Sequence, residues 1–537
     1  MDALSYAYGT NHFDRDRDLK AVLRDLWANH AQHWPALGEF GALAGGELYE
    51  SLYHIDHDAR PVLVAHNLDG ERIDRVRLSP SERQALEKTA WIMGLPYHGE
   101  SWLSHYALLY LIGDPGLGCI LTITQQTAYA LHKYGQSIPG QARIVEDLIS
   151  GRAWGATWMT ESQGGSDLGA NQATAREDGP LWRISGDKYF ASGAGLADYA
   201  IVTARPEGGA PGPKGLGLFL LPRIGSNGQL NYHVRRLKDK SATRAVPSGE
   251  VELQDAEAYL IGEAGRGIYY TLENLTVSRL ANAAAAMGVG KKAHLEVLGR
   301  VHRRHSFGAP LIGHPLIRRD LTDLAVRAAG GTALAFHSIA QFDGVWEEKP
   351  PFSARYHRVR FWSHLAKNRT AEHSAAMTQM AMELFGGLGF LEEYAVARWH
   401  REALITPIWE GPSNIQALDF LESVQRQHTD ESFWEEMTYL LSQAGTAPAR
   451  EALDIMERTL VNLRRFEGAE AQWMAKESLR TLADVAQVAL LYRLAEGQGE
   501  RYAKLAALYH ARFLNREEYP FWAYEDPDIW DEASSLA

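Results

Sequence analysis

The stretch ITPIWEGPSNIQALDFL (Ile405–Leu421) carries two acids, and the first, Glu410, stands just before the part that reads as a helix. Pro407, Ile408 and Trp409 precede this acid, so its carboxylate is expected to enter a poorly hydrated pocket. Desolvation raises the pKa of a carboxyl group and makes it a better proton acceptor near neutral pH. Glu410 is therefore a candidate base for a carbon-bound proton. The alternative is an acid in the first turn of a buried helix, where the helix dipole favours it.

A second candidate is the glycine-containing loop MTESQGGSDLGANQATA (Met159–Ala175). Its adjacent glycines, followed by Ser166 and Asp167, allow a turn that exposes N–H groups and hydroxyls. Such a turn suits the polar edge of a flat ring or a phosphate, and the alternative is a plain turn between a helix and a strand. A strand-like stretch further on offers an aromatic wall and a hydroxyl: Tyr189, Phe190 and Ser192.

The elements that must position these residues follow a helical, β, helical order. The chain reads as helical from Asp14 to about Ser150, alternates as strands do up to about Asp255, and returns to helices after Gly267. Ser79, Pro80 and Glu82 predict a capping box at a helix start. The fold class is therefore α+β, with four expected domains at residues 1–150, 151–262, 263–425 and 426–537.

Composition sets further bounds. A chain of 537 residues with 45% hydrophobic and 23% charged residues has ample buried volume for a large cofactor and is not disordered. The single cysteine, Cys119, excludes intrachain disulfides and fits a reducing compartment. No apolar leader and no uninterrupted run of 18 apolar residues is present, so a cytoplasmic protein is expected. His54 and His57 have metal-like spacing without a partner cluster, so no metal site is expected.

Four motifs in this order resemble those of the acyl-CoA dehydrogenase family of flavoproteins. The resemblance covers about residues 80–421. The motifs are T-E-x-x-G-G-S-D at Thr160–Asp167, R-x-x-F-G at Arg304–Gly308, G-G-x-G-F at Gly386–Phe390 and W-E-G at Trp409–Gly411. The resemblance implies an N-terminal helical domain, a middle antiparallel β-domain and a C-terminal four-helix bundle, here followed by an extra helical extension. It also implies a homotetramer, a dimer of dimers, with FAD near a subunit interface.

The resemblance also assigns roles to residues. The family reaction is the α,β-dehydrogenation of an acyl-CoA thioester, in which a carboxylate takes the α-proton and the β-hydrogen leaves as hydride to flavin N5. Glu410 matches the base, and the second known base position falls at Ser278, which is not a carboxylate. Ser166 and Arg279 are expected at the substrate. The positions expected to bind FAD are Met159, Thr160, Gly165, Ser166, Phe190, Ser192, Arg304, Phe307, Glu383, Gly387 and Asn414.

Three positions depart from the family pattern. Glu383 stands where many members have glutamine, and Phe190 stands where tryptophan is often found. Pro412 replaces the usual threonine after W-E-G and removes a hydroxyl and a backbone N–H, although Asn414 can still donate. FAD is therefore expected to bind through an altered set of hydrogen bonds. An electron-transfer flavoprotein and dioxygen both stay open as the electron acceptor, as does the acyl chain length.

Within the family, the AidB-type branch is the most similar. The shared features are RRLKDKSATR (Arg235–Arg244), MELFGGLGF, PIWEGPSNI and a helical extension after residue 421. This resemblance implies an alternative function, DNA or partner binding in a stress response with weak dehydrogenase activity. The basic run at 235–244 suits CoA phosphates, nucleic acid or simply a charged edge strand.

The charge of the extension disfavours DNA. Residues 421–537 hold 12 Lys and Arg against 21 Asp and Glu, a net charge of −9 within the −13 of the whole chain. DNA attracts proteins mainly through phosphate neutralisation, so an acidic extension is a poor partner. Four arginines either form a local basic stripe or pair with nearby acids on solvated helix faces: Arg464, Arg465, Arg501 and Arg512.

Overall fold

The computed structural model describes residue 1 and residues 4–531, and the chain divides into two compact units. Unit 1 comprises Met1–Glu50, Ser101–Pro115 and Arg279–Ala537, and unit 2 comprises Ser51–Glu100 and Gly116–Ser278. Residues 532–537, the end of the expected extension, lie outside the described residues. The α+β fold class and the helical, β, helical order are confirmed, whereas the four domain boundaries stay a prediction.

Seven strands of unit 2 form one sheet. They are β3 Gly155–Trp158, β4 Thr174–Asp178, β5 Leu181–Ser192, β6 Tyr199–Pro206, β7 Gly217–Pro222, β8 His233–Leu237 and β9 Ser248–Leu260. The order is β3-β6-β4-β5-β9-β7, with β8 beside β9, and β7 also pairs with β6. The β6 strand pairs in parallel with β3 and β4, and the other pairs are antiparallel, as the expected mostly antiparallel domain requires.

The core of unit 2 lies where this sheet packs on helices. Ile201, Leu218 and Leu220 share one face of β6 and β7, two strands that are buried on both faces, and they pack with Leu131 and Ile149. Leu131 lies on α6 Pro115–Tyr134, and Ile149 lies on α7 Gln141–Ile149. The helices therefore cover one face of β6 and β7, and β6 pairs with β3, the strand that leads into the glycine-containing loop.

Two predictions for the first half of unit 2 need correction. The part of the chain read as helical up to about Ser150 includes a hairpin of β1 Val62–His66 and β2 Arg72–Arg77. The capping box at α4 Pro80–Thr89 is only half made: Ser79 Oγ accepts the Glu82 N–H at 3.1 Å, but the Glu82 side chain does not reach back and is buried instead. Burial raises the pKa of Glu82 to about 9 against the opposing charge of Lys240.

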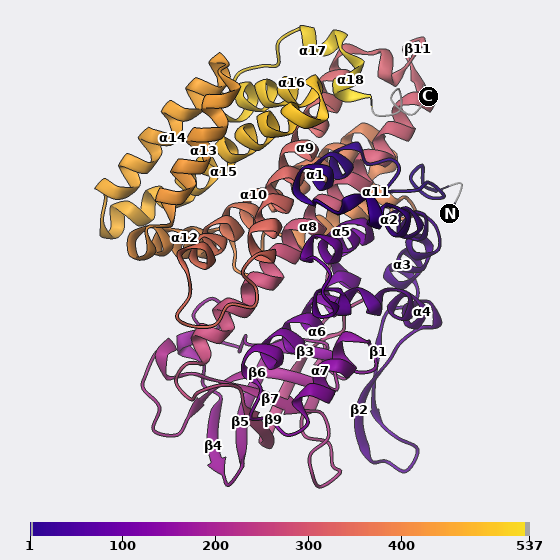
Figure 1. Ribbon diagram of the computed structural model, residues 1–537. Coiled ribbons are helices and arrows are strands. Elements are labelled where there is room, and N and C mark those ends of the chain that lie inside the picture. The colour runs from indigo at the N-terminus through magenta and orange to yellow at the C-terminus, as the bar shows by residue number, and fades with distance from the viewer. Residues whose placement is uncertain (2–3, 532–537) are drawn as a thin grey trace. The chain divides into compact units, whose positions relative to one another are not determined.

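Long helices of unit 1 pack side by side, as Figure 1 shows for α9 and α10. Those that form the bundle are α8 Gly267–Arg303, whose residues from Arg279 onward belong to unit 1, α9 Pro315–Asp343, α10 Ala354–Phe385, α11 Ala395–Ile405 and α12 Ser413–Gln427. The N-terminal helices are α1 Arg17–Leu26, α2 His30–Gly45, α3 Glu47–His57 and α5 Trp102–Ile112. The α8 and α5 backbones approach closely at Gly288, where an added Cβ would stand 2.1 Å from the Tyr110 carbonyl oxygen.

The extension after residue 421 is helical, as expected. Its helices are α13 Thr429–Ala444, α14 Ala447–Arg465, α15 Gly468–Gln498, α16 Glu500–Tyr509, α17 Trp522–Glu525 and α18 Pro527–Trp530. The apolar residues at helical spacing, among them Met456, Leu460 and Leu508, are buried. Figure 1 shows α13, α14 and α15 lying beside one another in this unit. Among the described helices none is long and apolar enough to cross a membrane.

Candidate active site

The predicted site residues fall in both units. Unit 2 holds Met159, Thr160, Gly165, Ser166, Phe190 and Ser192, and unit 1 holds Arg279, Arg304, Phe307, Glu383, Gly387, Glu410 and Asn414. Each group is built by its own unit. In the described part of the chain, no three His, Cys, Asp or Glu side chains gather in a way that could hold a metal ion.

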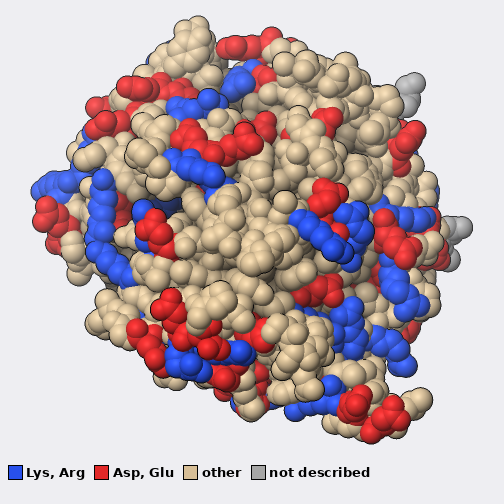
Figure 2. Space-filling view, turned by 60° about the horizontal axis from the view of Figure 1, so that its bottom comes forward, with Lys and Arg blue, Asp and Glu red and all other residues tan. Residues whose placement is uncertain are grey.

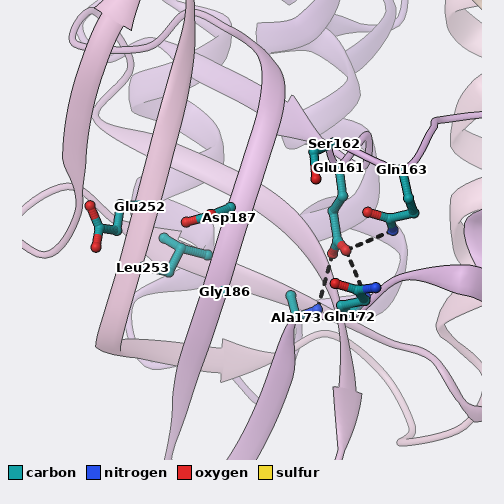
Figure 3. Close-up of a pocket in the computed structure, with 9 residues that line it drawn as sticks. All are labelled: Glu161, Ser162, Gln163, Gln172, Ala173, Gly186, Asp187, Glu252 and Leu253. Carbon is teal, nitrogen blue, oxygen red and sulfur yellow. Dashed lines mark hydrogen bonds between the residues drawn. The ribbon is translucent and has the colours of Figure 1, made fainter.

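A buried carboxylate anchors the glycine-containing loop of unit 2. The Glu161 carboxylate accepts hydrogen bonds from the backbone N–H groups of Gln172 (2.6 Å) and Ala173 (3.2 Å) and from Gln163 Nε2 (2.9 Å), as Figure 3 shows. Lys188 Nζ on β5 donates a fourth bond at 2.8 Å. The loop after β3 is thereby tied both to β4 and to the strand that carries Phe190. A pocket of about 370 Å³ lies beside this anchor. Figure 3 shows two further acids, Asp187 and Glu252, on its other side.

The sequence reasoning missed Glu161 and Lys188 as members of the site's framework. Glu161 is the second residue of the T-E-x-x-G-G-S-D motif, so the motif could have indicated that Glu161 belongs to the site. Lys188 lies in a strand where buried and exposed side chains alternate, and its side chain points to the buried face. Burial lowers the pKa of Lys188, and Glu161 opposes that shift. Burial also opposes ionisation of Glu161, but Lys188 and the hydrogen bonds prevail and lower its pKa to about 2.

Replacing Glu161 with glutamine is expected to lower the free energy of unfolding by about 2 kcal/mol, because a charge-assisted hydrogen bond to a buried lysine is lost. The folded pKa of Glu161 lies below the ordinary 4.5. Its contribution to stability is therefore complete above about pH 4.5 and is lost as the pH falls toward 2. Urea unfolding between pH 7 and pH 3 measures both effects. Glu177→Gln on β4, an exposed acid, is the matched control, and equal unfolding curves for the two variants would contradict the prediction.

A bulge in β5 presents two aromatic rings. The ladder between β5 and β9 shifts register between Lys188 and Ala191, so Tyr189 and Phe190 fall in the irregular part. Tyr189 N–H donates to the Thr160 carbonyl at 3.0 Å instead of to β9. The two ring centroids lie 5.3 Å apart, and the Phe190 side chain is 54% exposed. The bulge thus joins the motif loop to an outward aromatic surface.

Lysines and hydroxyls surround this surface. Lys238 Nζ lies 3.3 Å from the centroid of the Tyr189 ring and 4.8 Å from that of Phe190. Ser192 Oγ lies 3.0 Å from Ser248 Oγ, which also accepts from Lys240 Nζ at 3.1 Å. Unit 2 therefore offers an exposed aromatic face, a hydroxyl and a positive charge together on its sheet.

Glu410 occupies a left-handed turn of unit 1. Its φ is 57°, that of Gly411 is 92°, and α12 begins only at Ser413. A non-glycine residue in this conformation costs about 1–2 kcal/mol, so its surroundings must hold it. The alternative that Glu410 is an acid in the first turn of a helix is wrong, because α12 begins only at Ser413 and its first turn holds no acid.

Three side chains hold the carbonyls of this turn. The Glu410 carbonyl accepts from Gln416 Nε2 (2.8 Å) and Arg279 Nε (3.3 Å). The Gly411 carbonyl accepts from Lys367 Nζ (2.8 Å) and again from Gln416 Nε2 (3.0 Å). An added Cβ on Gly411 would stand 2.8 Å from Gln416 Nε2, so the glycine makes room for that amide. The preceding Trp409 donates its indole N–H to Asn282 on α8.

The Arg279 side chain is engaged by other residues of unit 1. Its side chain is buried, and its guanidinium donates to Asp419 on α12 at 2.8 Å. Burial lowers the pKa of Arg279, and Asp419 opposes that shift. Arg279 therefore fixes the position of the Glu410 carbonyl, and its expected contact with substrate stays a prediction.

Of the remaining predicted positions of unit 1, Phe307 and Gly387 lie at turns, whereas Glu383 lies near the end of α10 and Asn414 near the start of α12. Phe307 stands at the tip of the hairpin β10 His305–Ser306 and β11 Ala309–Pro310, with a φ of 49° and a side chain that is 98% exposed. Gly387 follows the end of α10, and a Cβ there would meet nothing within 4 Å. Gln379 Nε2 donates to the Glu383 carboxylate at 3.3 Å, and Lys476 Nζ donates to Asn414 Oδ1 at 3.3 Å.

The basic residues suggested for nucleic acid are engaged with acids. In the run 235–244, Arg235 pairs with Asp187 and Glu252, Arg236 and Lys238 pair with Glu250, and Arg244 pairs with Asp56. In the extension, Arg464, Arg501 and Arg512 pair with Asp430, Asp18 and Asp323. On the face shown in Figure 2, Lys and Arg side chains are interspersed with Asp and Glu side chains. Pairing with acids is thus supported for the residues named here, although the Arg501 pair is buried and does not lie on a solvated helix face.

Three family models match consecutive parts of the chain. They are the adaptive response protein AidB N-terminal domain at residues 5–149, the acyl-CoA dehydrogenase middle domain at 156–256 and the acyl-CoA dehydrogenase C-terminal domain at 265–425. The matched residues lie in both units and include every predicted site residue. The extension after residue 425 lies beyond the matched residues.

Relatives and solved structures agree with these matches. AidB of Escherichia coli is 36% identical over 272 residues, 50% of this chain and 48% of that protein. The 3-methylmercaptopropionyl-CoA dehydrogenase of Ruegeria pomeroyi is 32% identical over 451 residues, 75% of each chain. Caenorhabditis elegans ACDH-11 in complex with C11-CoA has the same fold, with a TM-score of 0.86 at 22% identity over 96% of this chain and 93% of that one. The match to AidB spans about half of that relative's length.

Proposed function

Because the chain belongs to the acyl-CoA dehydrogenase family, we propose that it is an FAD-dependent enzyme that desaturates an acyl-CoA thioester between its α and β carbons, with Glu410 as base. Members of this family are oxidoreductases that bind FAD. The observation that carries the proposal is the Glu410–Gly411 turn. The backbone of Glu410 is strained there, and four hydrogen bonds from side chains to the carbonyls of Glu410 and Gly411 maintain the turn. Strain of this kind gathers at functional sites.

The residues at the motif positions fit FAD, each unit by itself. In unit 2, an added Cβ on Gly165 would stand 2.5 Å from Thr160 Oγ1, so the loop requires glycine to keep the threonine hydroxyl in place. The exposed Phe190 ring offers a surface for a flat ring system, and Ser192 offers a hydroxyl. In unit 1, the strained turn at Phe307 holds an apolar ring out to solvent, which suits contact with a cofactor or a second copy of the chain.

The chain's own part in the reaction is proton transfer and charge stabilisation. The Glu410 carboxylate accepts the α-proton as the α C–H bond breaks, and that electron pair becomes the new Cα=Cβ bond while the β C–H pair leaves as hydride. Bound FAD supplies the two-electron acceptor for that hydride. The backbone N–H of Glu410 is the proposed donor to the thioester oxygen as negative charge develops there. The products on the protein are an enoyl thioester and a protonated Glu410.

The experiment is an anaerobic titration of the purified flavoprotein with short, long and branched acyl-CoAs, followed at the flavin absorbance band. Bleaching by one class of thioester is expected, and the most effective thioester identifies the substrate class. A homotetramer that passes its electrons to an electron-transfer flavoprotein or to dioxygen is part of the same proposal, and re-oxidation with each acceptor distinguishes the two. A bound flavin that no thioester reduces would overturn the proposed function.

A further inference from the structure

The feature that the proposed reaction leaves unexplained is a buried lysine behind the Glu410 turn. Lys367 lies in the middle of α10, and the residue is only 1% exposed. Its Nζ donates to the Gly411 carbonyl at 2.8 Å. An ammonium group is costly to bury, so a buried lysine that serves only to hold one carbonyl is a poor solution when an amide could do the same. Gln416 already donates to that carbonyl.

The charges around Lys367 come from three elements. Glu410 lies before α12, Arg279 lies on α8 and is paired with Asp419 on α12, and His364 lies one turn earlier on α10. Arg360, on the same helix, lies 3.8 Å from Glu422 in an ion pair. Because Arg279 and Asp419 balance each other, the net charge that Lys367 faces depends on Glu410 and His364.

His364 adds no charge to this cluster. Its Nδ1 donates to Gln416 Oε1 at 2.8 Å, which orients the amide that holds both carbonyls of the turn. Burial lowers the pKa of His364 to about 3, with Arg279 adding to the shift, so the ring is neutral at physiological pH. Burial likewise lowers the pKa of Lys367 to about 7, while the negative charge of Glu410 opposes that shift. The negative charge of Glu410 thus favours the charged form of Lys367.

We propose that Lys367 is a positioning residue for Glu410, which both fixes the left-handed turn through the Gly411 carbonyl and supplies the positive charge that keeps the Glu410 carboxylate ionised before catalysis. This inference rests on the proposed function for its kinetic consequence, but the coupling of the two residues does not. A nearby positive charge lowers the pKa of a carboxyl group by about 1–3 units. Without Lys367, Glu410 would therefore hold its proton up to a higher pH and be unable to accept another.

The kinetic experiment compares the rate of flavin reduction against pH in the wild type, Lys367→Met and Lys367→Arg. In Lys367→Met, the fall in rate on the acid side of the pH profile is expected to occur at a pH about one unit higher, or more. It is expected to stay in place in Lys367→Arg, because arginine keeps its charge throughout the range. Lys349→Met, the same change at an exposed lysine, is the control. An unmoved acid limb with a lower rate at every pH would show a purely structural role and overturn the proposal.

A second experiment needs no turnover. The thermal unfolding midpoints of the wild type, Lys367→Met, Glu410→Gln and the double variant form a mutant cycle at pH 6, where Lys367 is charged. The double variant is expected to be less destabilised than the sum of the two single variants, because each single change leaves the other charge without its partner. Additive shifts would overturn the proposed coupling. If no thioester reduces the flavin, the proposed function fails, and this cycle still decides whether Lys367 acts on Glu410.

Discussion

Glu410→Gln is expected to yield a folded, flavin-containing protein. Its flavin should be reduced by acyl-CoA about 10²–10⁴-fold more slowly, because a carboxamide cannot accept the α-proton. Removal of a general base costs about 10²–10⁴-fold in rate. Glutamine has nearly the size of glutamate. The hydrogen bonds that fix the turn go to backbone carbonyls, so the substitution leaves them in place. The chemistry, not the fold, is therefore the part that changes.

The measurement is anaerobic stopped-flow reduction with the thioester that bleaches the wild-type flavin most effectively. Glu435→Gln, at an exposed position of α13, is the matched control and should reduce at the wild-type rate. Unchanged flavin content and thermal midpoint in Glu410→Gln would separate loss of the base from loss of structure. Reduction of Glu410→Gln at the wild-type rate would show that another group takes the proton.

Much of the β-domain could be predicted because its strands carry local signals. Four stretches with alternating apolar residues became β5, β6, β7 and β9. The β1–β2 hairpin was not predicted because its residues are largely polar and only partly buried. The alternation of apolar and polar residues in these strands is therefore weak beside the turn signals of Asn67–Gly70. Glu82 had the right spacing for a capping box, but tertiary packing drew its side chain into the interior. Local patterns therefore failed where burial by distant segments decided the outcome.

The motifs located the site residues, but not the residues that hold them. Glu410 could be predicted because W-E-G is a contiguous pattern. Its left-handed turn, however, depends on residues that are distant in the chain. Lys367 lies 44 residues before Gly411, and Arg279 lies 131 residues before Glu410. A lysine inside a helix ordinarily indicates an exposed face. Nothing within the helix itself distinguishes Lys367 from such a residue. The framework of the site thus follows from three-dimensional packing, which one sequence does not show.

A buried ion pair joins the helical extension to the bundle of unit 1. Arg369 on α10 donates to both carboxylate oxygens of Asp484 on α15, at 2.6 Å and 3.1 Å. Tyr509 on α16 donates to the same carboxylate at 2.7 Å, and His373 Nε2 lies 2.8 Å from the Tyr509 hydroxyl. Arg369 and Asp484 are both buried. Three helices are therefore connected through one charged group that water does not reach.

Arg369→Met is expected to lower the free energy of unfolding by about 3–5 kcal/mol, because Asp484 would remain buried without its counter-charge. Arg369→Met combined with Asp484→Leu should recover much of this loss, since apolar side chains can replace a buried pair without leaving a charge unbalanced. Urea unfolding followed by tryptophan fluorescence measures both. Arg426→Met removes an exposed pair with Glu422 on α12 and should change the stability by less than about 0.5 kcal/mol. A loss equally small in Arg369→Met would mean that apolar packing alone attaches the extension.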